Sequence, residues 1–476
     1  MLPRHLILSL LFTAVASHAE VTSVSSEVVA SIDARAGLLT DVSDTLWDYA
    51  ELGYLETRSS ELLQTLFVES GFVVEPGVAG IPTAFTASFG QGEPVIVMLG
   101  EFDALPGISQ EAVPYLQPRV GRTSGQACGH NLFGAGSAGA ALAVRDWLES
   151  SGASGTIRFY GTPAEEGGSG KVYMVRAGLF DDVDVALHWH PAAINGVSAE
   201  SSLANKSAKF RFSGVSAHAA RAPERGRSAL DGVEAMNFMV NLLREHLPEA
   251  TRIHYVVTQG GIAPNVVPNF AESFYYVRHP NAAVLETIWD RVIATAEAAA
   301  KGTGTQLEYE VIHGNHSLLP NATLAQAMHR HLSAVGGPSY NAEEQAFARE
   351  IAKTLPAGSW SPGAEAVIAP YTETAAKGST DVGDVSWNVP TAGARVATFV
   401  PGTGLHSWQA IAAGGTSIGH QGVLIAAKTL ALTAVELLQS PAMVAAAREE
   451  FEQRRGSDFD YRPLLGDREP PLDYRR

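Results

Sequence analysis

The 476-residue sequence contains a single cysteine, Cys128, so the chain cannot form an intrachain disulfide. Its fold must therefore be stabilised by core packing. A lone cysteine is most often a small apolar side chain in a core, and less often a thiolate that binds a metal or attacks a substrate. The residues around Cys128 decide between these interpretations and are considered below.

Basic residues are also scarce, because 33 Lys and Arg stand against 50 Asp and Glu and give a formal net charge of −17. Nucleic acids and anionic membranes both require a basic protein surface, so this balance argues against either partner. An anionic small substrate stays possible, since a pocket can be locally positive inside an acidic protein. Hydrophobic residues make up 46% of the chain, which is typical of a globular protein with a sizeable core.

After the N-terminus, the sequence has no charge-free apolar run long enough to cross a membrane. The run from Leu6 to Val15 is too short for a membrane span, and small residues suited to cleavage follow it at Ser17 and Ala19. We therefore predict a signal peptide over residues 1–19, cleaved near Ala19, and an exported protein that is periplasmic or secreted. No cysteine stands near the cleavage position, so a lipid anchor is not expected.

The length of the chain predicts two domains, and the first is of the α/β class. Strands are expected at 94–100, 157–161 and 184–190, and helices at 27–56, 131–149 and 171–177. Strands that alternate with helices in this way predict a mixed, largely parallel sheet wrapped by helices. This catalytic domain is expected to comprise residues 20–205 and 315–455.

Residues 206–314 change in character and predict an inserted α+β domain. Strands are expected at 206–213, 252–258, 270–278 and 306–312, with helices at 228–247 and 283–300. The order β-α-β-β-α-β is that of a small open sandwich with its helices on one face. The remaining residues, 456–476, are rich in proline and charge, and we expect a tail that lies on the surface or is disordered.

Four clusters carry residues suited to chemistry. Cys128 and His130 lie two residues apart in a Gly-rich loop, where both can reach one metal ion. The pair Glu165-Glu166 follows a predicted strand, His188 and His190 share one face of another, and His406 lies in a loop. Taken singly, each cluster has an ordinary structural explanation, such as a charged turn or a hydrogen-bonded core histidine.

Together, several segments resemble the co-catalytic metallopeptidase and amidohydrolase family that includes aminoacylases, carboxypeptidase G and indole-acetyl-amino-acid hydrolases. Within it, the p-aminobenzoyl-glutamate hydrolase branch, in its B-type form, is most similar. The segments are AELGYLETRSSELL from Ala50, GEFDALPGISQ from Gly100, CGHNLFGAGS from Cys128, GTPAEEGGSGK from Gly161, SAHAARAPERGRSALDG from Ser216, GGIAPNVVPN from Gly260, STDVGDVSWNVPT from Ser379 and PGTGLHSW from Pro401. Their common order along the chain makes the resemblance specific.

The resemblance implies two divalent metal ions per chain, Zn or Mn. The implied ligands are Cys128 as a bridging ligand, His130, Glu166, His190 and His406. His188 is the alternative to His190, which keeps the family spacing of 190 − 166 = 24 residues from Glu166. Glu165 is implied as the general base, and Asp103 as the carboxylate that orients a histidine ligand.

The resemblance also implies that residues 206–314 form a lid and dimerisation domain. His218 is expected to stabilise the transition-state oxyanion, reaching the site of a partner subunit, and Asn265 and Arg278 to bind the substrate carboxylate. The partner is a second copy of the chain, giving a homodimer, or a homologous subunit, giving a heterodimer. The implied substrate is a small molecule with a linear amide bond: an N-acyl amino acid, a p-aminobenzoyl-glutamate-like compound or a dipeptide.

Two other hypotheses remain open. In the first, Cys128 is the nucleophile of a cysteine hydrolase, which would leave Glu165 and Glu166 without a role. In the second, the chain is an inactive homologue that binds a small molecule, which would require the loss of a ligand or of the base. None of the expected residues is missing from the sequence.

Overall fold

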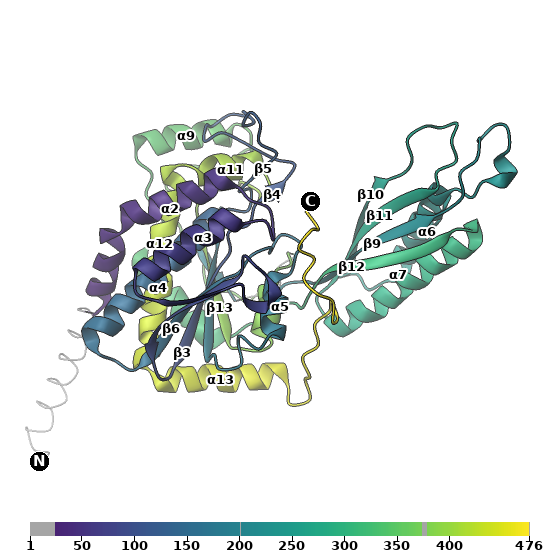
Figure 1. Cartoon of the computed structure of the whole chain (residues 1–476). Coiled ribbons are helices and arrows are strands. Elements are labelled where there is room, and N and C mark those ends of the chain that lie inside the picture. Colours follow the sequence, from purple (N-terminus) through teal and green to yellow (C-terminus); the bar gives the residue numbers. More distant parts are fainter. Residues whose placement is uncertain (1–23, 200, 374–377, 476) are drawn as a thin grey trace, which may run out of the picture.

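The computed structural model describes residues 24–199, 201–373 and 378–475, and Figure 1 shows two domains. The larger one is built on a seven-stranded sheet, and the smaller one extends from it as an arm around a four-stranded sheet. The predicted signal peptide, residues 1–19, lies outside the described residues.

The sheet of the catalytic domain is mixed and mainly parallel, as predicted. Its strands, in spatial order, are β1 (Val73–Pro76), β2 (Phe85–Gln91), β6 (Gly155–Gly161), β3 (Val95–Gly100), β7 (Val185–Ala192), β13 (Thr391–Ala397) and β8 (Gly196–Ser198). The four strands from β6 to β13 are parallel neighbours, and the outer pairings are antiparallel. Every residue of β3 is buried, because helices cover both faces of the sheet.

One face of the sheet is covered by α4 (His130–Ser151), which packs against α2 (Ala36–Tyr49) and α12 (Ser417–Gln439). Small residues on α4 permit this close packing, since a Cβ on Gly136 would lie 2.8 Å from the Trp189 ring. Among the described helices, α12 alone is long and apolar enough to cross a membrane, and 72% of its apolar window is buried in the protein. The burial of α12 therefore explains its apolar composition: it is a core helix of the larger domain.

The remaining helices of this domain complete the layers. They are α3 (Thr57–Glu69), α5 (Gly170–Arg176), α8 (Ala322–Val335), α9 (Ala342–Ala352), α10 (Val382–Ser386), α11 (Trp408–Gly414) and α13 (Pro441–Arg455). The helical region predicted over 27–56 is present up to residue 49 and is divided into two helices. A helix over 24–34 is separated from α2 at Arg35, and α2 ends where Ala50 takes a left-handed conformation with φ of 42°.

The lid has the predicted β-α-β-β-α-β order. Its sheet consists, in spatial order, of β10 (Arg252–Gln259), β11 (Phe270–His279), β9 (Ala204–Ser213) and β12 (Gln306–Asn315). Helices α6 (Ala229–Leu243) and α7 (Ala282–Thr303) lie along it (Figure 1). Ser228 and Asn281 cap these helices by accepting hydrogen bonds from the first-turn amides of Asp231 and Val284.

The C-terminal segment after α13 follows the surface, which is one of the two predicted alternatives, and residues 456–475 are anchored there by specific contacts. The segment runs between the two domains (Figure 1). Leu465 is buried, and Arg176 donates hydrogen bonds to the carbonyls of Gly466 and Arg468. The segment ends beside Glu166, where the side chains of Tyr474 and Arg475 both donate to the Glu166 carbonyl. The proline and charge content of the segment does not indicate these anchoring contacts.

Candidate active site

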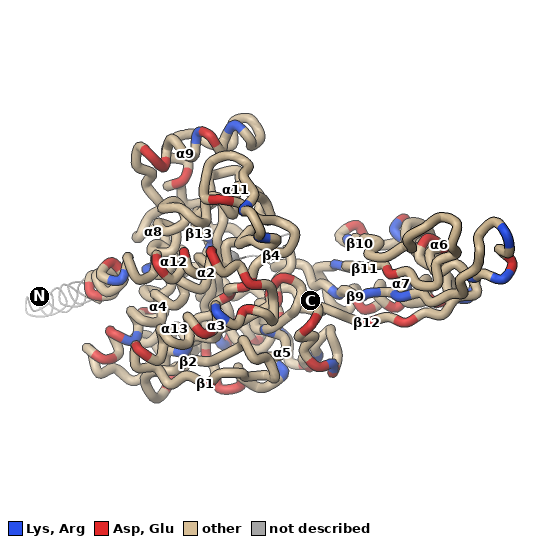
Figure 2. The backbone as a smooth tube through the Cα atoms, turned by 45° about the horizontal axis from the view of Figure 1, so that its top comes forward, with Lys and Arg blue, Asp and Glu red and all other residues tan. Residues whose placement is uncertain are grey.

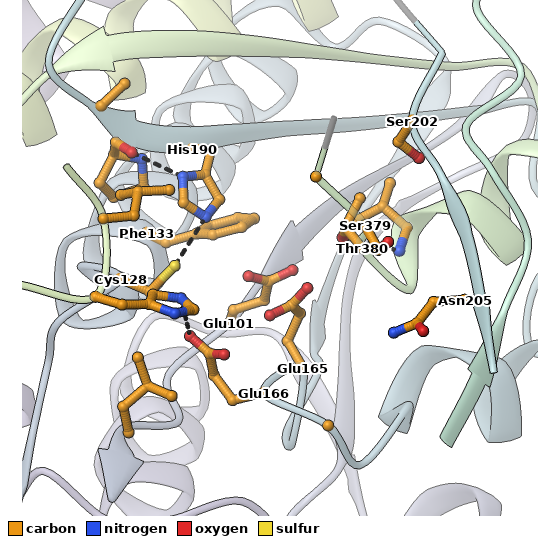
Figure 3. Close-up of a pocket in the computed structure, with 18 of the residues that line it drawn as sticks. Glu101, Cys128, Phe133, Glu165, Glu166, His190, Ser202, Asn205, Ser379 and Thr380 are labelled. Carbon is orange, nitrogen blue, oxygen red and sulfur yellow. Dashed lines mark hydrogen bonds and ion pairs between the residues drawn. The ribbon is translucent and has the colours of Figure 1, made fainter. Parts of the chain in front are cut away.

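A cavity of about 880 Å³ opens where the parallel strands end and the lid begins. Most of the residues singled out in the sequence line it. From the catalytic domain these are Cys128, Glu165, Glu166, His188, His190 and His406, and the lid contributes Asn205, Tyr276, Arg278 and His313. Figure 3 shows Cys128 and the glutamates on one side, with Ser202, Asn205, Ser379 and Thr380 across the cavity. This is the carboxyl edge at which α/β sheets carry their sites.

The loop that carries Cys128 is shaped by Gly129, whose φ of 80° favours glycine. A Cβ at this position would also lie 2.8 Å from Pro191 and 2.9 Å from Phe399. The turn starts α4 at His130 and leaves Cys128 just before it. The spacing of one residue between Cys128 and His130 therefore places both side chains at the same end of the helix.

Asp103 links two of the predicted metal ligands. Its Oδ1 lies 2.9 Å from His130 Nδ1, and its Oδ2 accepts a hydrogen bond of 2.9 Å from the backbone amide of Glu166. Burial alone would raise the pKa of Asp103, but the adjacent His130 outweighs burial and the pKa is lowered. The charged carboxylate holds His130 Nδ1 as the donor and leaves Nε2 as the atom that can bind a metal, which is the arrangement expected of a carboxylate that orients a metal-binding histidine.

The five predicted ligands form two overlapping groups around Cys128. Cys128 Sγ lies 3.5 Å from His190 Nε2, and Glu166 Oε1 lies 3.3 Å from His406 Nε2. The groups are Cys128 with His130 and His190, and Cys128 with Glu166 and His406; in each, the donor atoms lie within 4.8 Å of one another. His130 Nε2 and Glu166 Oε1 are buried and make no hydrogen bond, although Glu101 Oε2 lies 3.1 Å from the first atom and His406 Nε2 lies 3.3 Å from the second.

This donor set fits a divalent metal pair. Buried polar atoms without partners are rare, and here they point at a common space between thiol, imidazole and carboxylate groups. Burial raises the pKa of the Cys128 thiol, and the neighbouring Glu166 raises it further. A thiolate at this position therefore needs compensating positive charge, which divalent ions held by the two groups would supply.

The two strand histidines differ in their surroundings although both line the cavity. His190 Nδ1 lies 2.7 Å from the carbonyl oxygen of Pro191, so Nδ1 carries the hydrogen and Nε2 is free to bind a metal. Burial lowers the pKa of His190 to about 4, which keeps the ring neutral. The His188 ring lies instead over Gly393, where a Cβ would meet it at 2.3 Å.

We therefore expect His190→Ala to lose metal and activity together, because it removes a ligand atom beside Cys128. His188→Ala should retain the metal and lose mainly stability, since it removes a buried ring. The measurement is metal content per chain by elemental analysis, with thermal unfolding of both variants. Metal lost only from His188→Ala would reverse the assignment.

Glu165 lies beside the ligands with a half-buried carboxylate, and Figure 3 shows it next to Glu101. Burial raises the pKa of Glu165 well above its usual range, and the nearby carboxylates of Glu101 and Glu166 raise it further. The loop is held by Glu56, a fully buried residue that accepts a hydrogen bond of 2.8 Å from the Ala164 amide. Ala164 itself has a φ of 58°. No pattern around Glu56 indicates this role.

A buried charge cluster under the cavity was not predicted. The Lys171 ammonium lies 2.6 Å from Glu101 and 2.7 Å from Asp381, and none of the three side chains is more than 1% exposed. Glu101 Oε2 in turn lies 3.1 Å from His130 Nε2. The two acids belong to the segments GEFDALPG and STDVGDVS, and Lys171 ends the segment GGSGK, which superficially resembles a phosphate loop. Lys171 instead offsets the negative charge beneath the metal ligands.

The lid residues divide into two groups. Arg278 lies in the cavity, and burial lowers its pKa. His218 and Asn265 lie next to each other, since the Ala219 amide donates to the Asn265 carbonyl, but both are exposed and lie outside the cavity. Asn205 of β9 lines the cavity, and the strand ends at Ser213. At the usual rise per residue in a strand, these two residues lie about 26 Å apart. The loop of His218 follows at that far end.

Figure 2 shows that basic residues gather at this outer end of the lid, whereas many Asp and Glu residues lie over the catalytic domain. The loop between β9 and α6 carries Arg221, Arg225 and Arg227. Neither His218 nor Asn265 lines the cavity of its own chain.

Residues 97–409 match the model of peptidase family M20/M25/M40, two thirds of the chain. The chain belongs to this family. The family predicted from the motifs is thereby confirmed, and its M20 members are metal-dependent hydrolases of the amidohydrolase and peptidase type. The present chain is accordingly a metal-dependent amidohydrolase of the M20 family.

Two curated relatives and one solved structure extend the comparison. The B-type subunit of the p-aminobenzoyl-glutamate hydrolase of Escherichia coli (strain K12) is 44% identical, with 89% of this chain and 94% of that protein covered. The Xaa-Arg dipeptidase of Mus musculus is 29% identical, covering 92% and 94%. A dinuclear metal-binding peptidase of the M20 family from Bacillus subtilis superposes with a TM-score of 0.56 at 18% identity, covering 86% and 99%, which shows the shared fold.

Proposed function

We propose that this M20 chain hydrolyses the linear amide bond of an N-acyl amino acid, a p-aminobenzoyl-glutamate-like compound or a dipeptide. The observation that carries the proposal is a donor set of Cys128, His130, Glu166, His190 and His406, with the carboxylate of Glu165 next to His130 and outside the two groups that share Cys128. The similarity to the p-aminobenzoyl-glutamate hydrolase of Escherichia coli supports the inclusion of p-aminobenzoyl-glutamate-like amides among these substrates. A cysteine hydrolase is less well supported, because burial and acidic neighbours raise the pKa of Cys128.

The chemistry divides between the metals and the chain. When bound, two divalent ions supply a Lewis acid and acidify the attacking water, Zn being favoured by the thiolate and Mn by carboxylate ligands. Glu165 accepts the proton of that water and passes it to the leaving amine. Asp103 fixes the orientation of His130, and Arg278 binds the carboxylate of the substrate through its planar guanidinium.

The remaining groups come from a partner subunit in this proposal, a second copy of the chain or a homologous one. His218 Nδ1 accepts hydrogen bonds from the amides of Ala220 and Arg221, so Nε2 carries a hydrogen and is exposed as a donor. Such a donor can stabilise an oxyanion in the partner's site, and Asn265 lies beside it. Exposed apolar side chains on the lid, Phe238, Leu242, Val256, Val257, Ile262 and Val266, provide a surface for association.

The signal peptide prediction adds a location to this proposal: cleavage near Ala19 would leave an exported enzyme, active in the periplasm or secreted. The acidic net charge accords with a small-molecule substrate and with no nucleic-acid or membrane partner.

Removal of the metals tests the proposed reaction. We expect chelator-treated protein to lose hydrolysis of p-aminobenzoyl-glutamate, N-acetyl amino acids and dipeptides, and to regain it with Zn²⁺ or Mn²⁺. The unfolding temperature should fall with the metals, because ligands that bind only the folded state stabilise it. Turnover that persists in metal-free protein and disappears after alkylation of Cys128 would support the cysteine hydrolase instead.

A further inference from the structure

The C-terminal segment is held in a defined path up to the active site. Arg468 lies 2.8 Å from Glu310 of the lid, and Tyr173 and Arg176 of α5 contact the backbone of residues 466–469. The Tyr474 ring meets that of Tyr54 edge to face, with centroids 5.6 Å apart. Contacts to both domains therefore fix this segment. Its last described residues reach the cavity, although they lie outside residues 97–409, which match the family model.

Arg475 enters the substrate cavity beside Tyr276. Its guanidinium donates to the Glu166 carbonyl and lines the same cavity as Arg278. The Arg278 guanidinium lies 5.5 Å from the centroid of the Tyr276 ring. The Tyr276 hydroxyl and Arg475 Nη2 both lie next to Gly167. A Cβ added to this glycine would be 3.0 Å from the hydroxyl and 3.6 Å from Nη2. Tyr276 thus lies close to both guanidinium groups.

Neither guanidinium has a carboxylate partner among the residues that the structure describes. Within the described residues, no carboxylate forms an ion pair with Arg278 or Arg475, and the Nε atom of each is buried without a hydrogen-bond partner. Each partly buried cation loses hydration, and the carboxylates that line the cavity, Glu101, Glu165 and Glu166, form no ion pair with either guanidinium, so an anionic ligand would offset this cost. Guanidinium groups bind carboxylates through paired hydrogen bonds. The arrangement accordingly fits a ligand with two separate carboxylates.

We propose that Arg475 is a specificity-determining residue, which binds the side-chain carboxylate of an acidic amino acid while Arg278 binds its α-carboxylate. The assignment rests on the proposed amide hydrolysis and deepens it, naming N-acyl glutamate and aspartate as the substrate class. An amide of glutamine offers no second charge to Arg475, and an amide of arginine or lysine brings a cation against it. The C-terminal segment is therefore part of the substrate site.

The test compares p-aminobenzoyl-glutamate with p-aminobenzoyl-glutamine in metal-loaded enzyme. Wild-type protein should prefer the glutamate amide. Arg475→Ala should lower kcat/KM for that substrate by about 10- to 100-fold, mainly through KM, and change the glutamine amide little, because only the former loses a charged hydrogen-bond partner. Arg475→Lys keeps the charge without the planar fork and should retain part of the preference.

Two control variants separate selectivity from support of the Glu166 loop. Tyr474→Phe removes the other donor to the Glu166 carbonyl and should preserve the preference for glutamate. Arg462→Ala removes an exposed arginine of the same segment and should change nothing. An equal loss for both substrates in Arg475→Ala and Arg475→Lys would overturn the assignment and leave Arg475 as a brace for Glu166. Failure of wild-type enzyme to cleave either amide, or any other, would instead refute the proposed function.

Discussion

Glu165→Gln is expected to lower kcat by about 10²- to 10⁴-fold, the usual contribution of a general base, while the metal content stays unchanged. The amide is nearly isosteric with the carboxylate but cannot accept the proton of the attacking water. Glu165 does not belong to the two groups that share Cys128, although its carboxylate lies within 4.8 Å of donor atoms of Glu101 and His130 in a third group, so its loss should leave the Cys128 ligands in place. The measurement is kcat on p-aminobenzoyl-glutamate, paired with elemental analysis of the same preparation.

Glu166→Gln is the informative comparison, because the neighbouring residue is a predicted ligand whose Oε1 faces His406 at 3.3 Å. That variant should lose metal and activity together. Glu149→Gln, an exposed position on α4, should behave as wild type. Near-normal turnover in Glu165→Gln would show that another group accepts the proton. Loss of metal from Glu165→Gln would place Glu165 among the ligands instead.

The layered fold and the position of the site could be predicted from the sequence because both depend on local patterns. The run Val95–Gly100 is apolar throughout and becomes a strand buried on both faces. The chemistry-bearing residues follow strands, and parallel strands bring their carboxyl ends together. Cys128, Glu165, Glu166 and His190 therefore meet in one cavity although 62 residues separate the first from the last.

The groups that support the site could not be predicted, because their partners are distant in sequence and their residue types normally indicate a surface. Lys171 lies 210 residues from Asp381, and nothing local shows that this lysine is fully buried. The C-terminal segment has the composition of a disordered tail, yet Arg475 contacts Glu166 across 309 residues. The choice between His188 and His190 is a related case, since strand alternation places both on one face.

The second large effect concerns His218. We expect His218→Ala to lower kcat by about 10²- to 10³-fold, the cost of removing one oxyanion donor, although this residue lies outside the cavity of its own chain. Metal content should not change, because His218 is far from the ligands along β9. Kinetics and elemental analysis of the variant measure both quantities. A variant with full activity would remove His218 from the mechanism.

Mixing the two inactive variants reveals which chain completes the site. If the partner is a second copy, a dimer of one Glu165→Gln subunit and one His218→Ala subunit contains one intact site, made from Glu165 of one chain and His218 of the other. After subunit exchange at equal concentrations, about a quarter of the wild-type activity should return, since half of the randomly formed dimers are mixed and each has one working site of two. Either variant alone, carried through the same exchange, should stay inactive. Activity that returns only when a homologous subunit is added would show that the lid serves a heterodimer, and no return under either condition would overturn the proposed sharing of the site between subunits.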